Sequence, residues 1–235
     1  MSVSGFFARP GISQCCQLCG EATCEPVCQW CKNDTCFFYH DRLPVNLLLR
    51  PAIARYIRHR RYSALFACGF YQWPLNRLIH QFKFSRQVAT ARLLARWFAP
   101  LCSQISTPPD YLLPVPSPAN RYWQRQFNPA GVLADEISRW CHIPVFHGWA
   151  SRRPGKPQHT QNRSERFTNL RHAFAVQRLP QASCVAIVDD VVTTGCTADA
   201  LAGLILSQRP DICVQVWAIA VTPAPGRKHD SQAPL

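Results

Sequence analysis

The chain has 235 residues, of which 47% are hydrophobic and seven are tryptophan; this composition excludes a disordered chain and predicts one sizeable core with a small appendage. Lysine and arginine outnumber aspartate and glutamate by 26 to 13, a formal charge of +13 that favours phosphate-rich or nucleic-acid partners. No apolar run reaches the roughly 18 residues of a membrane span, and the N-terminus lacks the apolar core of a signal peptide, so we expect a cytoplasmic protein without a transmembrane segment.

The positive charge is unevenly distributed. Residues 42–109 contain eleven lysines or arginines and no acidic residue, and residues 147–172 contain six against Glu165 alone. A basic, soluble surface would account for the net charge, whereas this clustering favours a phosphate-bearing partner.

The thirteen cysteines predict thiols and metal ligands rather than disulfides, because no secretory signal accompanies them. Two Cys-x-x-Cys pairs, Cys16 with Cys19 and Cys28 with Cys31, are separated by eight residues. Two such knuckles can offer four thiolates to one tetrahedral structural zinc. A redox pair is the alternative, and three nearby cysteines could replace a ligand: Cys15, Cys24 and Cys36. We therefore expect a zinc-ribbon-like segment at 1–41.

Residues 42–72 are interpreted as a basic connector. Helical spacing over 47–61 places arginines at 50, 55, 58, 60 and 61, which form either a solvated helix face or a nucleic-acid contact. Residues 74–98 predict two helices, or one kinked helix, with a break at 84–86.

A short strand over 111–115 is followed by a loop with Arg121 and Arg125, which can hold a polyphosphate through bidentate hydrogen bonds. Asn128 and Pro129 predict the start of a helix that continues to about Cys141. Residues 144–146 predict another short strand, and 214–217 a closing strand. The long basic segment 151–172 is either a lid over a ligand or a basic loop with no specific ligand.

The most informative stretch is 184–197. An apolar run over 184–188 predicts a buried strand that stops at Asp189 and Asp190, and a helix is expected over 198–206. Between them lie five residues suited to a phosphate-binding turn: Thr193, Thr194, Gly195, Cys196 and Thr197. Two carboxylates beside a phosphate cradle predict a ligand with a diol and a phosphate, such as a ribose 5-phosphate. The alternative is two solvated aspartates before an ordinary helix.

This stretch resembles the phosphoribosyl-pyrophosphate (PRPP) signature of type I phosphoribosyltransferases. The wider pattern resembles the ComF family, and especially its GntX branch. It comprises the cysteine knuckles, Ile-His-Gln-Phe-Lys-Phe at 79–84, Pro-Val-Pro at 114–116, Arg-Gln-Phe-Asn at 125–128, Gln161, Arg166, Asn169, Leu170, Phe174 and the signature itself.

The resemblance implies an α/β fold, a type I phosphoribosyltransferase-like parallel sheet flanked by helices over 42–235, behind a small zinc ribbon. It also implies Gln161 and Arg166 in a lid over pyrophosphate, Mg²⁺ bound with PRPP, and a link to competence, DNA-uptake machinery or the use of DNA as nutrient. Gln126 replaces a usual glycine, and further cysteine pairs of the family are missing from 42–61.

Three functions follow from this interpretation. An enzyme would displace pyrophosphate from C1 of PRPP, although no residue is assigned as a base and the acceptor is not indicated. A single-stranded DNA-binding protein would keep a non-catalytic phosphoribosyl site and use the basic and aromatic residues over 55–97. A regulator would sense PRPP without turnover.

Overall fold

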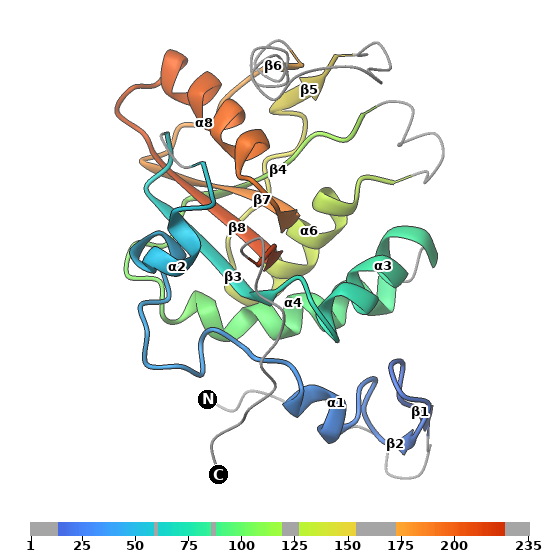
Figure 1. The fold of residues 1–235 in the computed structure, drawn as a ribbon. Helices are drawn as coiled ribbons and strands as arrows, with labels where there is room; N and C mark the ends of the chain where they lie inside the picture. The colour runs from blue at the N-terminus through green and yellow to red at the C-terminus, as the bar shows by residue number, and fades with distance from the viewer. Residues whose placement is uncertain (1–13, 59–60, 86–87, 119–126, 154–172, 224–235) are drawn as a thin grey trace, which may run out of the picture.

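The computed structural model describes residues 14–58, 61–85, 88–118, 127–153 and 173–223. Its centre is a four-stranded, fully parallel sheet in the order β3-β8-β7-β4 (Figure 1). The strands of this sheet are β3 (Ala64–Phe70), β4 (Tyr111–Pro114), β7 (Cys184–Val192) and β8 (Cys213–Val221). Its larger helices are α3 (Leu75–Ser85), α4 (Val88–Cys102), α6 (Pro129–Cys141) and α8 (Cys196–Gln208). The expected α/β class is confirmed.

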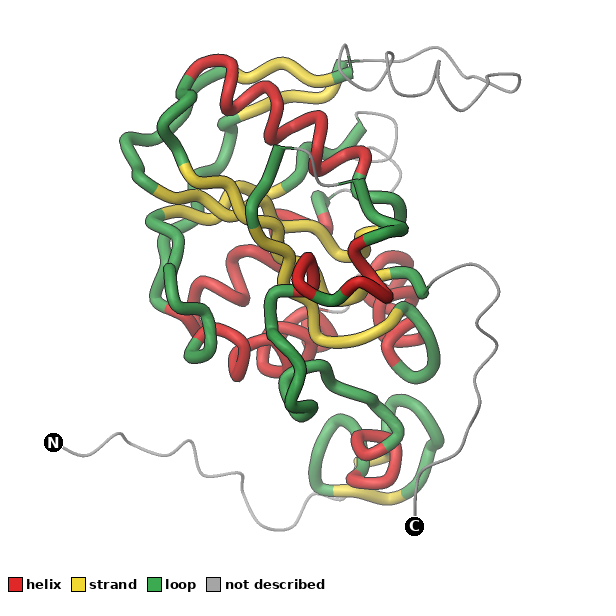
Figure 2. Tube along the Cα trace, turned by 60° about the vertical axis from the view of Figure 1, so that its left-hand side comes forward, coloured by secondary structure: helices red, strands yellow, loops and turns green. Residues whose placement is uncertain are grey.

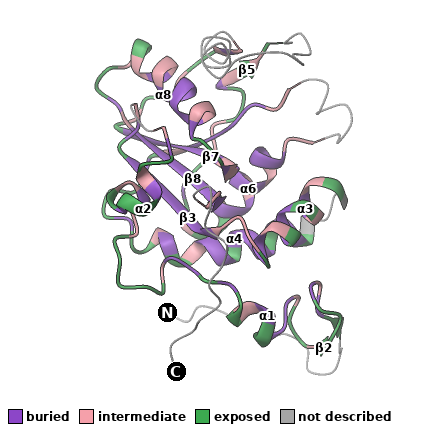
Figure 3. Ribbon diagram, in the orientation of Figure 1, coloured by how far each residue is buried: buried purple, intermediate pink, exposed green. Residues whose placement is uncertain are grey.

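Both faces of the sheet are covered, as a parallel sheet requires (Figure 3). On one face Trp217 of β8 packs against Phe98 of α4, with ring centroids 5.1 Å apart, and α3 and α6 complete that layer. On the other face Val216 packs in one cluster with Leu201 of α8. Burial of a side chain such as Phe98 contributes about 1.5–3 kcal/mol, so these two layers hold the sheet rigidly.

The central strand β7 is longer than the sequence predicts. It was expected to stop before Asp189, but it pairs with β8 through Val192, with Asp189 opposite Ala218. The expectation was wrong because both aspartates lie inside a ladder whose hydrogen bonds do not depend on side-chain polarity. The prediction that 214–217 forms a strand is confirmed by β8.

The basic connector is not one helix. Residues 47–61 contain only η1 (Leu47–Leu49) and α2 (Pro51–Ala54), followed by turns. Pro51 starts α2, and Arg50 is drawn into the core, where its Nη1 lies 2.8 Å from Asp41 Oδ2. The following apolar run forms β3, an edge strand of the sheet that was not predicted, because Ala64, Ala67 and Gly69 gave it little β character.

The remaining local predictions are largely confirmed. A break separates α3 from α4, and α6 begins at Pro129 with Asn128 as its N-cap. The strand expected over 144–146 is reduced to a single parallel bridge between Val145 and Leu112. A small hairpin, β5 (Ala150–Arg152) with β6 (Phe174–Val176), flanks the segment that holds the expected lid.

The N-terminal segment consists of the hairpin β1 (Gln14–Cys15) with β2 (Ala22–Thr23) and the short helix α1 (Gln29–Asn33). It lies below the sheet, beside α3 and α4 (Figure 2). Phe37 meets Trp97 edge-on at 5.2 Å, and Gln81 Nε2 donates to the carbonyl oxygen of Gln17 at 3.3 Å. The segment therefore shares its hydrophobic cluster with the α/β layers.

One cysteine pair departs from the expectation of thiols. Cys102 and Cys141, at the ends of the adjacent helices α4 and α6, are joined in a disulfide with a Cα–Cα distance of 6.0 Å. Within the described residues, none of the helices combines the length and apolarity needed to cross a membrane.

Candidate functional site

The acidic pair lies at the carboxyl end of β7, where open parallel sheets bind ligands. Asp190 continues the strand face of Val188, which packs against α3, and there its Oδ2 lies 2.8 Å from the ammonium nitrogen of Lys83. Asp189 accepts a hydrogen bond from the backbone N–H of Asp190, with N and Oδ1 2.9 Å apart. The pair is therefore fixed by one cation and one peptide group.

The charge of the pair is reduced at neutral pH. Burial, and then the neighbouring charge of Asp190, raise the pKa of Asp189 to about 7. The Asp190 N–H, Lys83 and Arg152 act in the opposite direction. Asp189 thus titrates in the physiological range, and the pair can serve as both donor and acceptor toward hydroxyl groups.

The turn after β7 has the conformation that a phosphate cradle needs. Gly195 has φ of 72° and caps the N-terminus of α8, whose first residues are Cys196 and Thr197. Thr193 and Thr194 are exposed, and Thr194 Oγ1 donates to Cys196 Sγ at 2.9 Å. The first N–H groups of a helix have no partner within it, so this turn aims partial positive charge at the region before α8. The helix starts two residues earlier than predicted.

Three hydrogen bonds fix the end of β4 and the residues that follow it. Trp149 Nε1 donates to the carbonyl oxygen of Pro114 at 2.8 Å. The amide of Asn128 donates to the carbonyl oxygen of Val115 at 3.0 Å and accepts from the hydroxyl of Ser117 at 2.7 Å, instead of capping α6 with its side chain. These contacts position the start of the loop that continues toward Arg121.

The four predicted metal ligands converge. The sulfurs of Cys16, Cys19, Cys28 and Cys31 all lie within 4.8 Å of one another. Those of Cys19 and Cys28 are 3.6 Å apart, close to the roughly 3.8 Å expected for two thiolates bound tetrahedrally at 2.3 Å to zinc.

The thiols of the cluster differ in acidity: burial raises the pKa of Cys31, whereas Cys16 has thiolate character. Burial raises the pKa of its thiol, but backbone N–H groups of Cys19, Cys28 and Leu18 outweigh burial and lower the pKa to about 6. The donor set fits a closed structural zinc site, which Cys15, Cys24 and Cys36 do not join.

Comparison with known proteins agrees with this arrangement. The chain is 32% identical over 215 residues to the DNA utilization protein YhgH of Escherichia coli strain K12, covering 88% of this chain and 90% of that protein. It is 34% identical over 165 residues to competence protein F of Haemophilus influenzae, covering 65% of this chain and 70% of that protein. The chain belongs to the ComF family.

Two further comparisons add little to this ComF-family assignment. No family model matches the chain. A solved structure of adenine phosphoribosyl transferase from Trypanosoma brucei, in complex with AMP, pyrophosphate and ribose-5-phosphate, is similar over 73% of this chain and 91% of its own, with 12% identity and a TM-score of 0.38. That similarity is too low to support a functional inference.

The ComF-family residues expected to hold pyrophosphate, Arg121, Arg125, Gln161 and Arg166, lie outside the described residues. The structure places two basic residues near the acidic pair that the sequence did not indicate. Lys83 belongs to the 79–84 stretch, whose resemblance to the family gave it no role, and Arg152 acts on Asp189 through its charge.

Two of the connector arginines pair with a buried carboxylate that the sequence did not indicate. Arg58 Nε and Arg61 Nη1 lie 3.2 and 3.0 Å from Oδ2 of Asp199, which is 1% exposed in the first turns of α8. Because each of these two side chains pairs with a buried carboxylate, neither lies on a freely solvated helix face; a nucleic-acid contact of these arginines stays a prediction. Arg60 lies outside the described residues.

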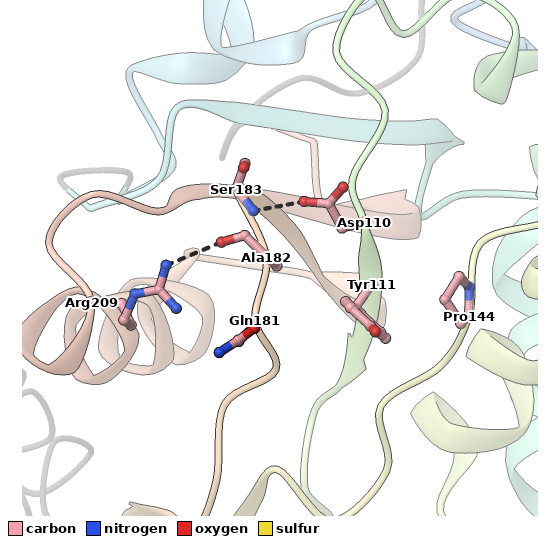
Figure 4. Close-up of a pocket in the computed structure, with 7 residues that line it drawn as sticks. All are labelled: Asp110, Tyr111, Pro144, Gln181, Ala182, Ser183 and Arg209. Atoms are coloured by element: carbon pink, nitrogen blue, oxygen red, sulfur yellow. Dashed lines mark hydrogen bonds between the residues drawn. The ribbon is translucent and has the colours of Figure 1, made fainter.

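A concavity of about 770 Å³ lies at the amino ends of β4 and β7, at the edge of the sheet opposite the acidic pair (Figure 4). There Asp110 accepts hydrogen bonds from the N–H groups of Cys184 and Ser183, which lower the pKa of its carboxyl. Arg209 donates to the carbonyl oxygen of Ala182. These contacts join loop to strand, and Asp110 is occupied as a structural acceptor.

Proposed function

We propose that this ComF-family protein binds the ribose 5-phosphate group of PRPP, or of a phosphoribosylated small molecule, at the carboxyl end of β7. The observation that supports this most directly is the placement of Asp189 and Asp190 a few residues before a left-handed glycine that caps α8. One strand-turn-helix unit thereby offers hydroxyl acceptors and an anion cradle a few residues apart.

Each part of the unit has a role in this proposal. The carboxylates of Asp189 and Asp190 accept hydrogen bonds from the two ribose hydroxyls. The N-terminus of α8 and the hydroxyls of Thr193, Thr194 and Thr197 bind the 5-phosphate. Lys83 keeps the acidic pair from repelling an anionic ligand.

Catalysis by this site would be displacement of pyrophosphate from C1 of PRPP. The carboxylate oxygens of Asp189 and Asp190 are hard donors of the kind that Mg²⁺ prefers, and the bound ion would neutralise charge on the departing pyrophosphate. The protein itself orients the ribose and holds the phosphate. Pyrophosphate release from PRPP across a panel of bases and amines distinguishes an enzyme from a sensor that binds without turnover.

Calorimetric titration with ribose 5-phosphate and with PRPP tests the binding proposal. We expect the Asp189→Asn, Asp190→Asn double variant to lose at least tenfold in affinity while its circular dichroism is unchanged. Asp211→Asn is the matched control, because Asp211 is an exposed acid paired with Arg209 after the other end of α8. Equal affinity in the folded double variant and the parent would place the ligand elsewhere.

A second function, single-stranded DNA binding, is favoured by one observation. Arg77, His80 and Phe84 are exposed and share one face of α3, since they are spaced by three and four residues. The rings of His80 and Phe84 lie 4.5 Å apart at 33°, and Trp73, just before the helix, is 46% exposed. Aromatic rings interleaved with cationic groups suit base stacking and backbone tracking.

Fluorescence anisotropy with a labelled oligonucleotide at several salt concentrations tests this surface. Phe84→Ala should weaken binding about fivefold at constant salt slope, because a stacked base contributes about 1–3 kcal/mol. Arg77→Ala should also reduce the salt slope by about one. Trp140→Ala, which removes a 50% exposed ring from α6, should change neither quantity. Absence of binding at low salt would exclude this second function.

A further inference from the structure

The turn proposed to bind phosphate is built against a neighbouring segment. The backbone N–H of Arg58 donates to the carbonyl oxygen of Thr194 at 2.8 Å, and the hydroxyl of Tyr62 donates to the carbonyl oxygen of Arg58 at 2.8 Å. A Cβ on Gly195 would lie 2.5 Å from that carbonyl oxygen and 2.8 Å from the Tyr62 hydroxyl. The turn and this segment therefore interlock, with space for glycine only.

The same segment is tied to α8 by charge. Asp199 N–H donates to the carbonyl oxygen of Gly195 at 2.8 Å, and its buried carboxylate binds Arg58 and Arg61. Arg61 reaches Asp199 across Gly203, where a Cβ would lie 2.7 Å from Arg61 Cδ. We call Arg58, Arg61, Tyr62 and Asp199 the clamp.

The clamp also offsets the negative charge of Asp199 at the N-terminus of α8. A lone buried carboxylate in the first turns of α8 would repel an anion bound there. Two guanidinium groups on one carboxylate leave a net charge of +1, which restores the attraction that the helix end provides. The contacts and the charge of the clamp thus both favour an anion at the N-terminus of α8.

We propose that Arg58, Tyr62 and Asp199 are positioning residues for the phosphate of the ligand, and that the clamp holds residues 193–197 in the conformation that binds it. This inference rests on the proposed ribose 5-phosphate site. The clamp governs affinity for the phosphate and leaves the contacts to the sugar, which come from β7, unchanged.

The test compares ribose 5-phosphate with ribose in the full-length protein, by calorimetry for the former and NMR titration for the weaker ligand. Tyr62→Phe removes only the hydroxyl that holds the Arg58 carbonyl, and should weaken ribose 5-phosphate binding three- to tenfold. Asp199→Asn should weaken it at least tenfold. Neither should change the ribose affinity by more than twofold.

Three further variants separate positioning from general stability. Arg58→Lys should recover part of the affinity lost in Arg58→Ala, because a cation is restored beside Asp199. Arg209→Ala, at the opposite end of α8, should bind like the parent. Unchanged ribose 5-phosphate affinity in folded Tyr62→Phe and Asp199→Asn overturns the clamp alone. Failure of the parent to bind ribose 5-phosphate overturns the proposed function and this inference with it.

Discussion

Lys83 Nζ lies 2.8 Å from Oδ2 of Asp190, so the last turn of α3 delivers a cation to an acidic pair that is more than a hundred residues away in the sequence. Asp190 is 8% exposed and the Lys83 side chain 22% exposed, which limits screening of this ion pair by solvent. The ion pair links the helical layer to the candidate site.

Replacement of Lys83 by methionine should raise the pKa of Asp189 above its value of about 7, because the charge of Lys83 acts to lower it. The titration of ¹³C-labelled aspartate carboxyls, followed by NMR, measures this directly. Lys32→Met, on the distant helix α1, is the control and should leave the midpoint unchanged. An unaltered midpoint in Lys83→Met would show that the charge of Lys83 does not act on Asp189 in solution.

The raised pKa of Asp189 also predicts how stability depends on pH. The unfolded carboxyl ionises near 3.8 and the folded one near 7, so the stabilising contribution of Asp189 is full below about 4 and is lost as pH rises through 7. In Asp189→Asn the unfolding free energy should vary less with pH between pH 5 and 8. At pH 8 the unfolding free energy of the variant should exceed that of the parent by about 2 kcal/mol.

Urea unfolding at pH 5 and pH 8 measures this effect. Asp211→Asn serves as the control, because the side chain of Arg209 lowers the pKa of Asp211 and so moves its titration away from this pH range. If the unfolding free energy of Asp189→Asn still fell between pH 5 and pH 8 as it does in the parent, the pH dependence would belong to another group.

Gly195→Ala should destabilise the protein by about 3 kcal/mol, since the alanine would need φ of 72° and would place its Cβ against the Arg58 carbonyl oxygen. Gly148→Ala separates these causes, because Gly148 has φ of 68° but nothing within 4 Å of the added Cβ. We expect Gly148→Ala to lower the unfolding free energy by about 1 kcal/mol, measured by urea unfolding. Equal losses for the two would mean that the turn and the clamp do not interlock.

The cysteine cluster should bind one zinc ion per chain, because four convergent sulfurs complete a tetrahedral site. Elemental analysis of freshly purified protein measures the zinc content. Cys31→Ser should lose the zinc and the protease resistance of the N-terminal segment, whereas Cys24→Ser, an exposed cysteine outside the cluster, should keep both. A zinc-free parent with an equally resistant segment would contradict the prediction.

Much of the candidate site was readable from local patterns. The two cysteine pairs and the Asp189-to-Thr197 turn each lie within a short stretch of sequence, so their spacing predicts that the residues converge, which the structure confirms for the cysteines. Lys83 and the clamp residues make contacts between segments that are far apart in the sequence. From the sequence alone, their charges cannot be told from ordinary surface charge. The strand β3 was missed because a small-residue run buried on both faces carries no alternation.

Helix α3 contacts both the N-terminal cysteine segment and the acidic pair. Gln81 of α3 holds the backbone of Gln17, inside the first cysteine knuckle, and Lys83, two residues further along, holds Asp190. Phe82, between them, is 1% exposed and anchors the helix in the core. The same helix therefore contacts both the cysteine knuckle and the acidic pair, and we expect chelation or oxidation of those thiols to shift Lys83 away from Asp190.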